Sequence, residues 1–409
     1  MGIDFKSLPQ RIEQIQVATP EGAAGTLQHS ANYRFSYNES AEQVALAMPV
    51  RTEPYNRGAL HPVFEMNLPE GFIRRELSER LQRYTRINDM LFLAIQGDEG
   101  IGRLSYMSDI DRTPTTPDDL DEIINWDRPD NIFIELLDRH LFNTTLSGMQ
   151  PKVAVSTEKA LLQGKNLIIK SAGDDYPNLA LNEFVCMRIA AAAGLPTPVF
   201  QLSRNRQLFI MERFDVLDEH KLGMEDFTVL MGRSGQERYL GSYENAARVI
   251  DVYGGSHGDL RRFFEYVALS CMLGNGDAHL KNFALLYTHP GATPRLSPIY
   301  DVVCTRIYEL EAKTLALKMN GSREFPDRRG LLRFAKSLGV KGAESRMEEM
   351  ADLALQTITA TAELEDFPKL KQTLRASISR AMAVDGSQAG FVRKRKDAKK
   401  RKADSLREP

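Results

Sequence analysis

Short runs of alternating apolar and polar residues predict strands in the first half of the chain. Tyr33–Tyr37 alternates as a half-buried strand does, and residues 44–49 show the same tendency. Residues 161–171 predict a strand pair, with residues 163–166 as its turn. The apolar run at residues 207–214 predicts a further strand. The first half is therefore expected to be rich in strands.

Helical periodicity occurs early in the chain and dominates its second half. The charged stretch 74–84, after a turn at residues 68–71, predicts an amphipathic helix. Residues 178–193 predict a strong helix that a glycine and a proline end. Residues 260–273 and 343–383 are also mainly helical in pattern. A strand-rich half followed by a helix-rich half predicts a bilobal α+β enzyme with its chemistry at the junction.

Changes in composition suggest where the parts of the chain begin and end. Residues 106–131 combine prolines with many Asp and Thr residues, which predicts a surface loop or linker. We expect an N-terminal mixed subdomain and linker at residues 1–131, followed by the strand-rich, ATP-binding part of an N-terminal lobe at residues 132–216. A helical C-terminal lobe with the catalytic loop is expected at residues 217–390, and a disordered basic tail at residues 391–409.

Overall composition fits an ordinary globular protein of two or three domains. The 409 residues are 42% hydrophobic and 26% charged, with a formal charge of −2. No segment approaches the roughly 20 apolar residues of a membrane helix, and the first residues do not resemble a secretory signal. Cys186, Cys271 and Cys304 lie far apart in apolar surroundings, so we expect buried free thiols and a cytoplasmic location.

The near-neutral charge conceals a basic tail. Eight of the ten residues 393–402 are Lys or Arg, which predicts a solvated, disordered segment. The tail could simply aid solubility. Alternatively, it could contact the phosphates of nucleic acid, without reading bases because no aromatic residues alternate with the charges.

A polar loop follows the apolar helix. Gly274 suits the end of that helix, and the loop then carries Asp277 and Asn282 before residues 283–287 resume as a strand. Asp301 follows further along the chain. This spacing is the one that protein-kinase-like folds use around Mg²⁺ and ATP. It predicts a phosphotransferase.

Each polar residue of the loop has an expected role. Asp277 would accept or align the proton of the attacking hydroxyl, whereas Asn282 and Asp301 offer oxygen ligands to magnesium. Lys281 could offset phosphate charge or balance Asp277, and His279 is expected to hold the loop, with a role at the reaction centre as the alternative. The competing interpretation is a plain turn, because Asn, Asp and Gly are common in turns.

A second cluster of residues supports an ATP site. Lys170 ends an apolar strand and Glu183 lies on the next helix, as in kinases where such a lysine contacts the phosphates and the glutamate. Glu212 and Phe214 end the following strand, where a kinase hinge meets adenine. Residues 144–152 form a small polar loop that could cradle phosphate, with Ser147, Gly148 and Lys152 as its candidate contacts.

Together these motifs resemble those of the HipA toxin kinases. The resemblance covers roughly residues 25–380. It is carried by Ser-Gly-Met-Gln-Pro-Lys (147–152), Ile-Ile-Lys (168–170), Asn-Glu-Phe (182–184), Glu-Arg-Phe-Asp (212–215), Gly-Asn-Gly-Asp-Ala-His-Leu-Lys-Asn-Phe (274–283), Tyr-Asp (300–301), and in the N-terminal part Tyr-Arg-Phe (33–35) and Asn-Leu-Pro-Glu-Gly (67–71).

The resemblance implies a Ser/Thr protein kinase of a type II toxin–antitoxin system, with a fold distantly related to eukaryotic kinases. It implies that Asp277 is the catalytic base, that Asn282 and Asp301 bind Mg²⁺, and that Lys170 contacts the phosphates of ATP. Family members typically phosphorylate an aminoacyl-tRNA synthetase, which arrests growth. They also bind a helix-turn-helix antitoxin, and this complex represses its operator DNA.

The chain departs from the family pattern within the small polar loop at residues 144–152. The best-known members autophosphorylate a serine three residues before the loop glycine, which ejects the loop and silences the kinase. Thr145 occupies that position here, and Ser147 follows. Either hydroxyl could be the target, and an added phosphate would carry about −1.5 to −2 charges.

Two other function classes remain as alternatives. The chain could be a catalytically weak, kinase-like co-repressor that acts by binding antitoxin and operator DNA. It could also be a metal-dependent phosphohydrolase with Asp277, His279 and Asp301 as ligands. The co-repressor does not need an intact set of kinase residues, and the phosphohydrolase has no use for Lys170 or Glu183.

Overall fold

The computed structural model describes most of the chain. The described residues are 8–110, 118–126, 132–140, 152–157, 165–171, 176–218, 220–308 and 314–383. Within them no helix is both long and apolar enough to cross a membrane. All three cysteines are buried free thiols, as predicted.

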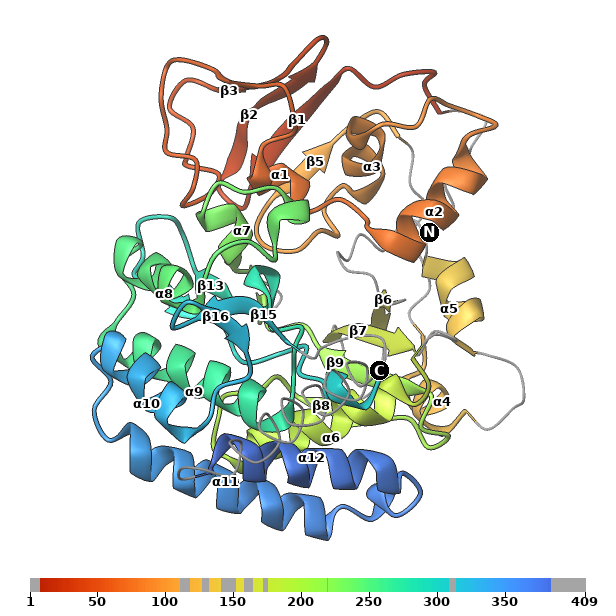
Figure 1. Cartoon of the computed structure of the whole chain (residues 1–409). Coiled ribbons are helices and arrows are strands. Elements are labelled where there is room, and N and C mark those ends of the chain that lie inside the picture. Colours follow the sequence, from red (N-terminus) through yellow and green to blue (C-terminus); the bar gives the residue numbers. More distant parts are fainter. Residues whose placement is uncertain are drawn as a thin grey trace, which may run out of the picture.

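The N-terminal subdomain is built on an antiparallel sheet with the strand order β4-β3-β2-β1-β5. Its strands are β1 (Gln14–Thr19), β2 (Gly22–His29), β3 (Tyr33–Tyr37), β4 (Tyr55–Arg57) and β5 (Ser105–Met107). Ile15, Leu27 and Phe35 face one another across β1, β2 and β3 and are buried, so one face of the sheet forms a core. Helices α1 (Pro62–Glu65), α2 (Gly71–Leu81) and α3 (Asp89–Gln96) complete this subdomain (Figure 1).

A second antiparallel sheet, with the order β6-β7-β9-β8, forms the middle of the molecule. Its strands are β6 (Lys152–Thr157), β7 (Lys165–Ser171), β8 (Phe200–Leu202) and β9 (Leu208–Glu212). Side chains alternate between its faces. Leu167 and Ile169 join the N-terminal core with α4 (Leu120–Asn125) and α5 (Ile132–His140). Phe209 and Met211 face the other core, which includes α6 (Leu179–Ala192).

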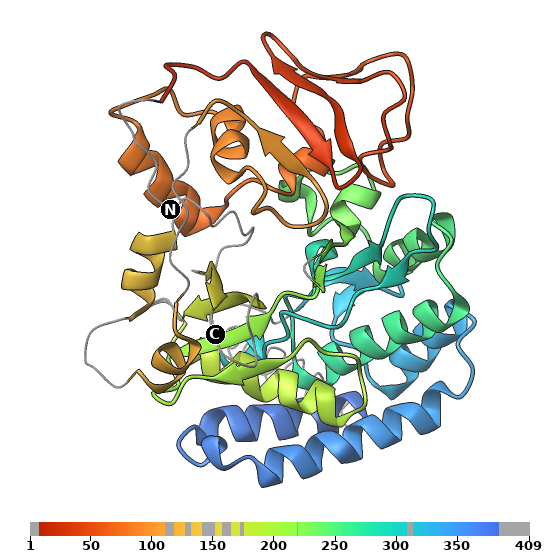
Figure 2. The ribbon, with the colours of Figure 1, turned by 180° about the vertical axis from the view of Figure 1, so that it is seen from behind.

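The rest of the chain is mainly helical. Its helices are α7 (Phe227–Leu230), α8 (Tyr243–Val252), α9 (His257–Leu273), α10 (Arg328–Ser337), α11 (Ala343–Ala360) and α12 (Pro368–Ala381). Helix α9 is buried almost all round from Phe263 onward and is the centre of this lobe, as expected for a helix without a polar face. Helices α11 and α12 lie at the end of the molecule opposite the N-terminal sheet in both views (Figures 1 and 2).

Small strands and single turns complete the helical lobe. The strands are β10 (Val216–Leu217), β11 (His220–Lys221), β12 (Gly223–Asp226), β13 (Ala284–Tyr287), β14 (Arg295–Leu296), β15 (Thr314–Met319) and β16 (Ser322–Glu324), and the single turns are η3 (Gly235–Glu237), η4 (Leu280–Asn282), η5 (Thr305–Ile307) and η6 (Ala362–Leu364). The bilobal α+β fold predicted from the sequence is confirmed.

Three sequence predictions were wrong in detail. Residues 44–49 make only an isolated bridge between Ala45 and Met48, because Glu225 binds the intervening amides instead of a partner strand. Within the segment predicted to be a linker, β5 pairs with β1 and helix α4 buries Leu120 and Ile123. The predicted turn at 163–166 was misplaced, since Lys165 and Asn166 already belong to β7 and pair with β6.

Candidate active site

Lys170 joins the two halves of the candidate site. Its Nζ lies 2.5 Å from Glu183 Oε1 and 2.6 Å from Asp301 Oδ1. These residues come from β7, α6 and the segment after β14, so three distant parts of the chain meet at one ammonium group. The side chains of Lys170 and Glu183 are 3% and 0% exposed, whereas that of Asp301 is 31% exposed.

The charge on Lys170 is maintained by its two partners. Burial by itself would lower the pKa of Lys170, but the carboxylates of Asp301 and Glu183 outweigh it and raise the pKa above its ordinary value. The lysine is therefore an ammonium ion at neutral pH. A charged group this deeply buried is stable only while it is paired.

The loop at residues 274–282, called the catalytic loop below after its predicted role, follows α9 and carries Asp277. Gly274 ends the helix with a left-handed φ of 71°, and the Asn275 amide donates back to Ser270. The side chain of Asn275 then accepts a 2.9 Å hydrogen bond from the Asp277 amide, which forms an Asx turn. The competing prediction of a turn is thus also correct, and this turn holds the backbone of Asp277 in place. Its Oδ1 accepts a 2.8 Å hydrogen bond from the Tyr239 hydroxyl.

Asn282 and Asp301 lie side by side. Asn282 Nδ2 is 3.4 Å from Asp301 Oδ2, and Asn282 Oδ1 is buried without a hydrogen-bond partner among the described residues. Asp301 has a left-handed φ of 59°, a conformation that a non-glycine residue adopts at some cost. This backbone angle orients one carboxylate oxygen to Lys170 and the other toward Asn282.

Asn282 and Asp301 suit a magnesium ion that also binds phosphate and water better than they suit a metal ion whose ligands all come from the protein. No cluster of three or more His, Cys, Asp or Glu side chains suited to a metal occurs in the described part of the chain. One carboxylate and one buried amide oxygen are what Mg²⁺ uses when phosphates and waters supply its remaining ligands. Asn282 and Asp301 would therefore hold the ion only together with a phosphate-bearing substrate.

His279 is a buried residue of the loop. It is 7% exposed, and its ring meets the Tyr239 ring edge-on, with centroids 5.0 Å apart. Burial and the nearby Arg238 lower the pKa of His279 to about 3, so its ring is neutral at neutral pH. Its backbone amide donates to the Asp277 carbonyl, which tightens the loop.

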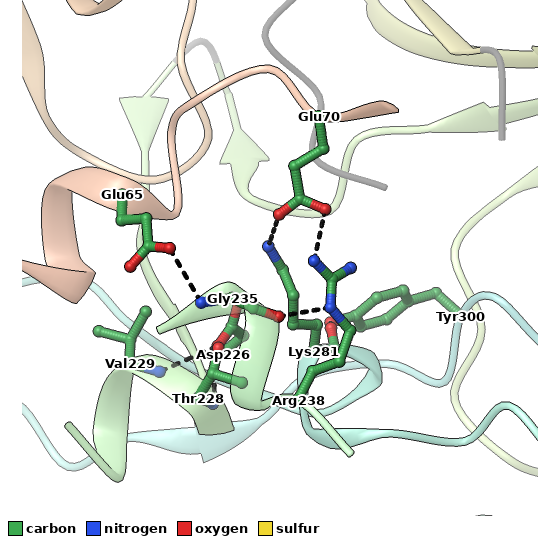
Figure 3. A network of polar contacts seen from close by, with 9 residues as sticks. All are labelled: Glu65, Glu70, Asp226, Thr228, Val229, Gly235, Arg238, Lys281 and Tyr300. Carbon is green, nitrogen blue, oxygen red and sulfur yellow. Dashed lines mark hydrogen bonds and ion pairs between the residues drawn. The ribbon is translucent and has the colours of Figure 1, made fainter. Parts of the chain in front are cut away.

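Lys281 connects the loop to the N-terminal subdomain. Its Nζ lies 2.8 Å from Glu70 Oε1, and its carbonyl accepts a 2.7 Å hydrogen bond from the Tyr300 hydroxyl (Figure 3). Sequence reasoning assigned no function to Glu70, although the residue belongs to one of the family motifs. The two residues are 211 positions apart, so no local pattern could have paired them.

Of the hinge candidates, Glu212 ends β9 and Phe214 lies just beyond it. The Glu212 amide donates to the Val199 carbonyl, and the Phe214 ring packs against Tyr300 with centroids 5.1 Å apart. Phe214 therefore lies next to the residue that precedes Asp301. Arg213 is instead a buried structural residue that pairs with Asp215 and binds the Glu99 and Gly100 carbonyls of the N-terminal subdomain.

The phosphate-loop candidates are mostly outside the described residues. Thr145, Ser147 and Gly148 belong to residues that the structure does not describe. Lys152 begins β6 and pairs in register with Lys170 on the neighbouring strand β7. The loop therefore leads directly into the strand beside Lys170.

Comparisons with known proteins identify the family. The HipA-like C-terminal domain family matches residues 144–362, and the HipA N-terminal domain family matches residues 15–107. The first match alone spans more than half of the chain. The chain belongs to the HipA family. The matched segments include every candidate of the catalytic loop as well as Lys170 and Glu183.

Individual relatives agree with this assignment. The chain is 29% identical over 294 residues to Y4dM of Sinorhizobium fredii, described as a candidate kinase, covering 68% of this chain and 70% of that protein. It is 26% identical over 211 residues to the serine/threonine-protein kinase toxin HipA of Shewanella oneidensis, covering 43% of this chain and 46% of the toxin.

A solved structure shows the same fold. HipA in the Shewanella oneidensis complex of HipA, HipB and operator DNA superposes with a TM-score of 0.67 at 18% identity, over 90% of this chain and 97% of that chain. This likeness shows that the chain has the fold of HipA.

Proposed function

We propose that this HipA-family chain is a Ser/Thr protein kinase toxin that transfers the γ-phosphate of ATP to a protein hydroxyl. The observation that carries the proposal is the ammonium of Lys170 held between Glu183 and Asp301. In kinases, a lysine paired in this way binds the nucleotide phosphates, and the aspartate binds the metal. A phosphohydrolase site would have no use for the lysine–glutamate pair.

The buried charges explain how the site can accept nucleotide. Glu183 and Asp301 share the positive charge of Lys170. Magnesium, when bound with ATP, would neutralise phosphate charge and polarise the γ-phosphoryl group. Asn282 and Asp301 would hold it, and Lys170 would turn its charge to the phosphates. One cation faces two carboxylates, so this cluster carries net negative charge that a magnesium ion would offset.

Asp277 would accept the proton of the acceptor hydroxyl in this proposal. In the transfer, the bond between the γ-phosphorus and the bridging oxygen of ATP breaks and ADP leaves with the electron pair. A bond forms from the acceptor oxygen to the phosphorus, and the acceptor proton passes to the Asp277 carboxylate. The Asn275 side chain accepts a hydrogen bond from the Asp277 amide and so fixes the backbone that carries this carboxylate.

The remaining candidate residues receive proposed roles from their positions in the chain. Glu212 and Phe214 would contribute the hinge that meets adenine, and Ser147, Gly148 and Lys152 would contact the phosphates. His279 would keep the loop closed as a neutral side chain. Autophosphorylation at Thr145 or Ser147 would switch the enzyme off, because a phosphate of about −1.5 to −2 charges cannot share a pocket with those of ATP.

The partners follow from family membership. We propose that the chain binds a helix-turn-helix antitoxin and, in that complex, operator DNA, because HipA of Shewanella oneidensis forms a complex with HipB and its operator DNA. The proposed substrate is an aminoacyl-tRNA synthetase, whose phosphorylation would inhibit translation in the cytoplasm. The basic tail at residues 391–409 would add contacts to DNA phosphates.

The proposal is tested with purified protein and Mg-ATP. Wild-type protein should bind nucleotide and gain phosphate at Thr145 or Ser147, as located by mass spectrometry, and Asp277→Ala should gain none. Phosphoproteomics after induction of the two forms would identify the substrate. Nucleotide binding without phosphate transfer would favour the co-repressor instead, and absence of both would reject the kinase.

A further inference from the structure

Glu70 contacts two loops of the helical lobe, although it belongs to the N-terminal subdomain. Its carboxylate lies 2.8 Å from Lys281 Nζ and 2.7 Å from Arg238 Nη2 (Figure 3). Lys281 belongs to η4 of the catalytic loop, and Arg238 follows η3. One carboxylate therefore joins three segments that are distant in sequence.

The location of Glu70 on its own helix makes this contact unusual. Glu70 occupies the N-cap position of α2, where a side chain commonly binds the first amides of the helix. It makes no such bond, and its carboxylate is directed away from α2 to the opposite lobe. The contact is therefore not a by-product of helix capping.

The ion pairs of Glu70 with Lys281 and Arg238 are strengthened by their burial. The side chains of Lys281, Arg238 and Glu70 are only 9%, 14% and 22% exposed. Burial would raise the pKa of Glu70, but Lys281 and Arg238 outweigh it and lower the pKa to about 2. The carboxylate is thus ionised throughout the neutral range, and its two contacts are charge-assisted at both ends.

Both loops that Glu70 holds lead to the reaction centre. Lys281 precedes the metal-ligand candidate Asn282, and its carbonyl binds the Tyr300 hydroxyl next to Asp301. Arg238 precedes Tyr239, whose hydroxyl binds Asp277, and the Arg238 carbonyl accepts the Leu280 amide. A shift of either cation would therefore move groups that touch the substrate.

We propose that Glu70 is a positioning residue by which the N-terminal subdomain fixes the catalytic loop for phosphoryl transfer. The proposal rests on the proposed function. It assigns the small subdomain a direct part in catalysis, through Lys281 and Arg238, in addition to packing. Nucleotide binding should depend on it little, because Lys170 and Glu183 lie on other elements.

Glu65 supplies a matched control. It is also a carboxylate of the N-terminal subdomain, and its Oε1 accepts a 3.0 Å hydrogen bond from the Gly235 amide in η3. It thus contacts the same loop without contacting Lys281 in Figure 3. Glu65→Gln removes a carboxylate charge at the same boundary between the lobes, but it leaves the pair of Glu70 with the catalytic loop intact.

The first measurement does not depend on activity. Hydrogen–deuterium exchange of the full chain should show faster exchange at residues 277–287 in Glu70→Gln than in wild type, whereas Glu65→Gln should leave that segment unchanged. Equal exchange in all three proteins, or an equal increase in both variants, would overturn the proposal.

The second measurement follows catalysis. Glu70→Gln should lower kcat for phosphate transfer about tenfold, as expected for a slight misplacement of reacting groups, while KM for ATP stays within about twofold. Glu70→Asp should recover part of kcat because it restores the charge, and Glu65→Gln should match wild type. An unchanged or raised kcat in Glu70→Gln would overturn the positioning role. If wild type itself fails to bind Mg-ATP, the proposed function fails, and the exchange result alone decides whether Glu70 fixes the loop.

Discussion

The hydroxyl of Tyr239 donates a 2.8 Å hydrogen bond to Oδ1 of Asp277, which an acceptor hydroxyl would have to reach in the proposed transfer. Tyr239 lies at the surface of the site. The residue is 41% exposed, Arg323 binds its backbone carbonyl, and its ring rests edge-on against His279. Its hydroxyl therefore occupies one oxygen of Asp277 from the exposed side of the loop.

Removal of this hydroxyl should ease access to Asp277. A hydrogen bond to a partly exposed carboxylate contributes about 1 kcal/mol, so Tyr239→Phe should raise the rate of phosphate transfer by about two- to fivefold. KM for ATP should not change, because the hydroxyl binds Asp277 and not the Lys170 cluster.

Tyr239→Ala separates the hydroxyl from the ring. It also removes the contact with His279, and it should therefore lose activity through a looser loop. Radiolabelled phosphate incorporation under single-turnover conditions measures both variants. A lower rate in Tyr239→Phe would mean that the hydroxyl orients Asp277 and does not compete with the acceptor.

The Lys170 cluster should dominate stability near the site. Lys170→Met removes the cation that pairs with Glu183, whose side chain is fully buried, and should destabilise the protein by roughly 3–5 kcal/mol. Urea denaturation measures the loss, and phosphate transfer should fall below detection.

A second substitution tests the cause of that loss. The double variant Lys170→Met/Glu183→Gln removes the buried charge as well, so it should be more stable than Lys170→Met alone, while remaining inactive. A double variant whose loss equals the sum of the two single losses would show that packing, and not uncompensated charge, explains the effect.

Glu70 should make stability depend on pH in the acid range. Its pKa is lowered from an ordinary value of 4.5 to about 2 in the folded protein, because Lys281 and Arg238 favour the ionised carboxylate. The unfolded chain therefore binds its proton first as the pH falls, so the stabilisation is complete above about pH 4.5 and is lost toward pH 2. The contribution is on the order of 2–3 kcal/mol.

Glu70→Gln lacks this titration. The difference in unfolding free energy between wild type and Glu70→Gln should be constant from pH 8 to pH 5 and should shrink between pH 4.5 and pH 3. Chemical denaturation at these pH values measures it. A difference that changes near pH 7 would assign the effect to another group.

Gly274 should be intolerant of a side chain. Its φ is 71°, and an added Cβ would lie 2.7 Å from Arg306 Cδ and 2.8 Å from Ser377 Oγ. Gly339 has a similar φ of 69° after α10, but an added Cβ would meet nothing within 4 Å. Gly339→Ala should cost about 1 kcal/mol from backbone strain alone.

The matched pair separates strain from crowding. Gly274→Ala should cost at least about 1 kcal/mol more than Gly339→Ala and should also slow phosphate transfer, since the loop to Asp277 begins there. Thermal denaturation and the transfer assay measure the two effects. Equal melting temperatures for the two variants would show that Arg306 and Ser377 move aside without cost.

Local chemistry explains why much of this site could be predicted. Gly274 is a helix-ending residue, Asn275 forms the expected Asx turn, and the run Leu208–Glu212 has the length and apolar content of a buried strand. Each of these depends on neighbours within a few positions. Where a segment was misread, as at residues 44–49, the competing partner was the distant carboxylate of Glu225.

The sequence by itself determined the α+β class, the two-part order of strands and helices, and the residue types that phosphoryl transfer requires, because these follow from periodicity and short spacings. Only the tertiary structure decided which residues meet. It placed Lys170 between Glu183 and Asp301, Tyr239 on Asp277, and Glu70 on Lys281. These pairs are separated by 13 to 211 positions, and most depend on how elements from distant parts of the chain pack together. Packing of distant apolar faces leaves no local trace in the chain, so neither Tyr239 nor Glu70 could be recognised before the fold was known.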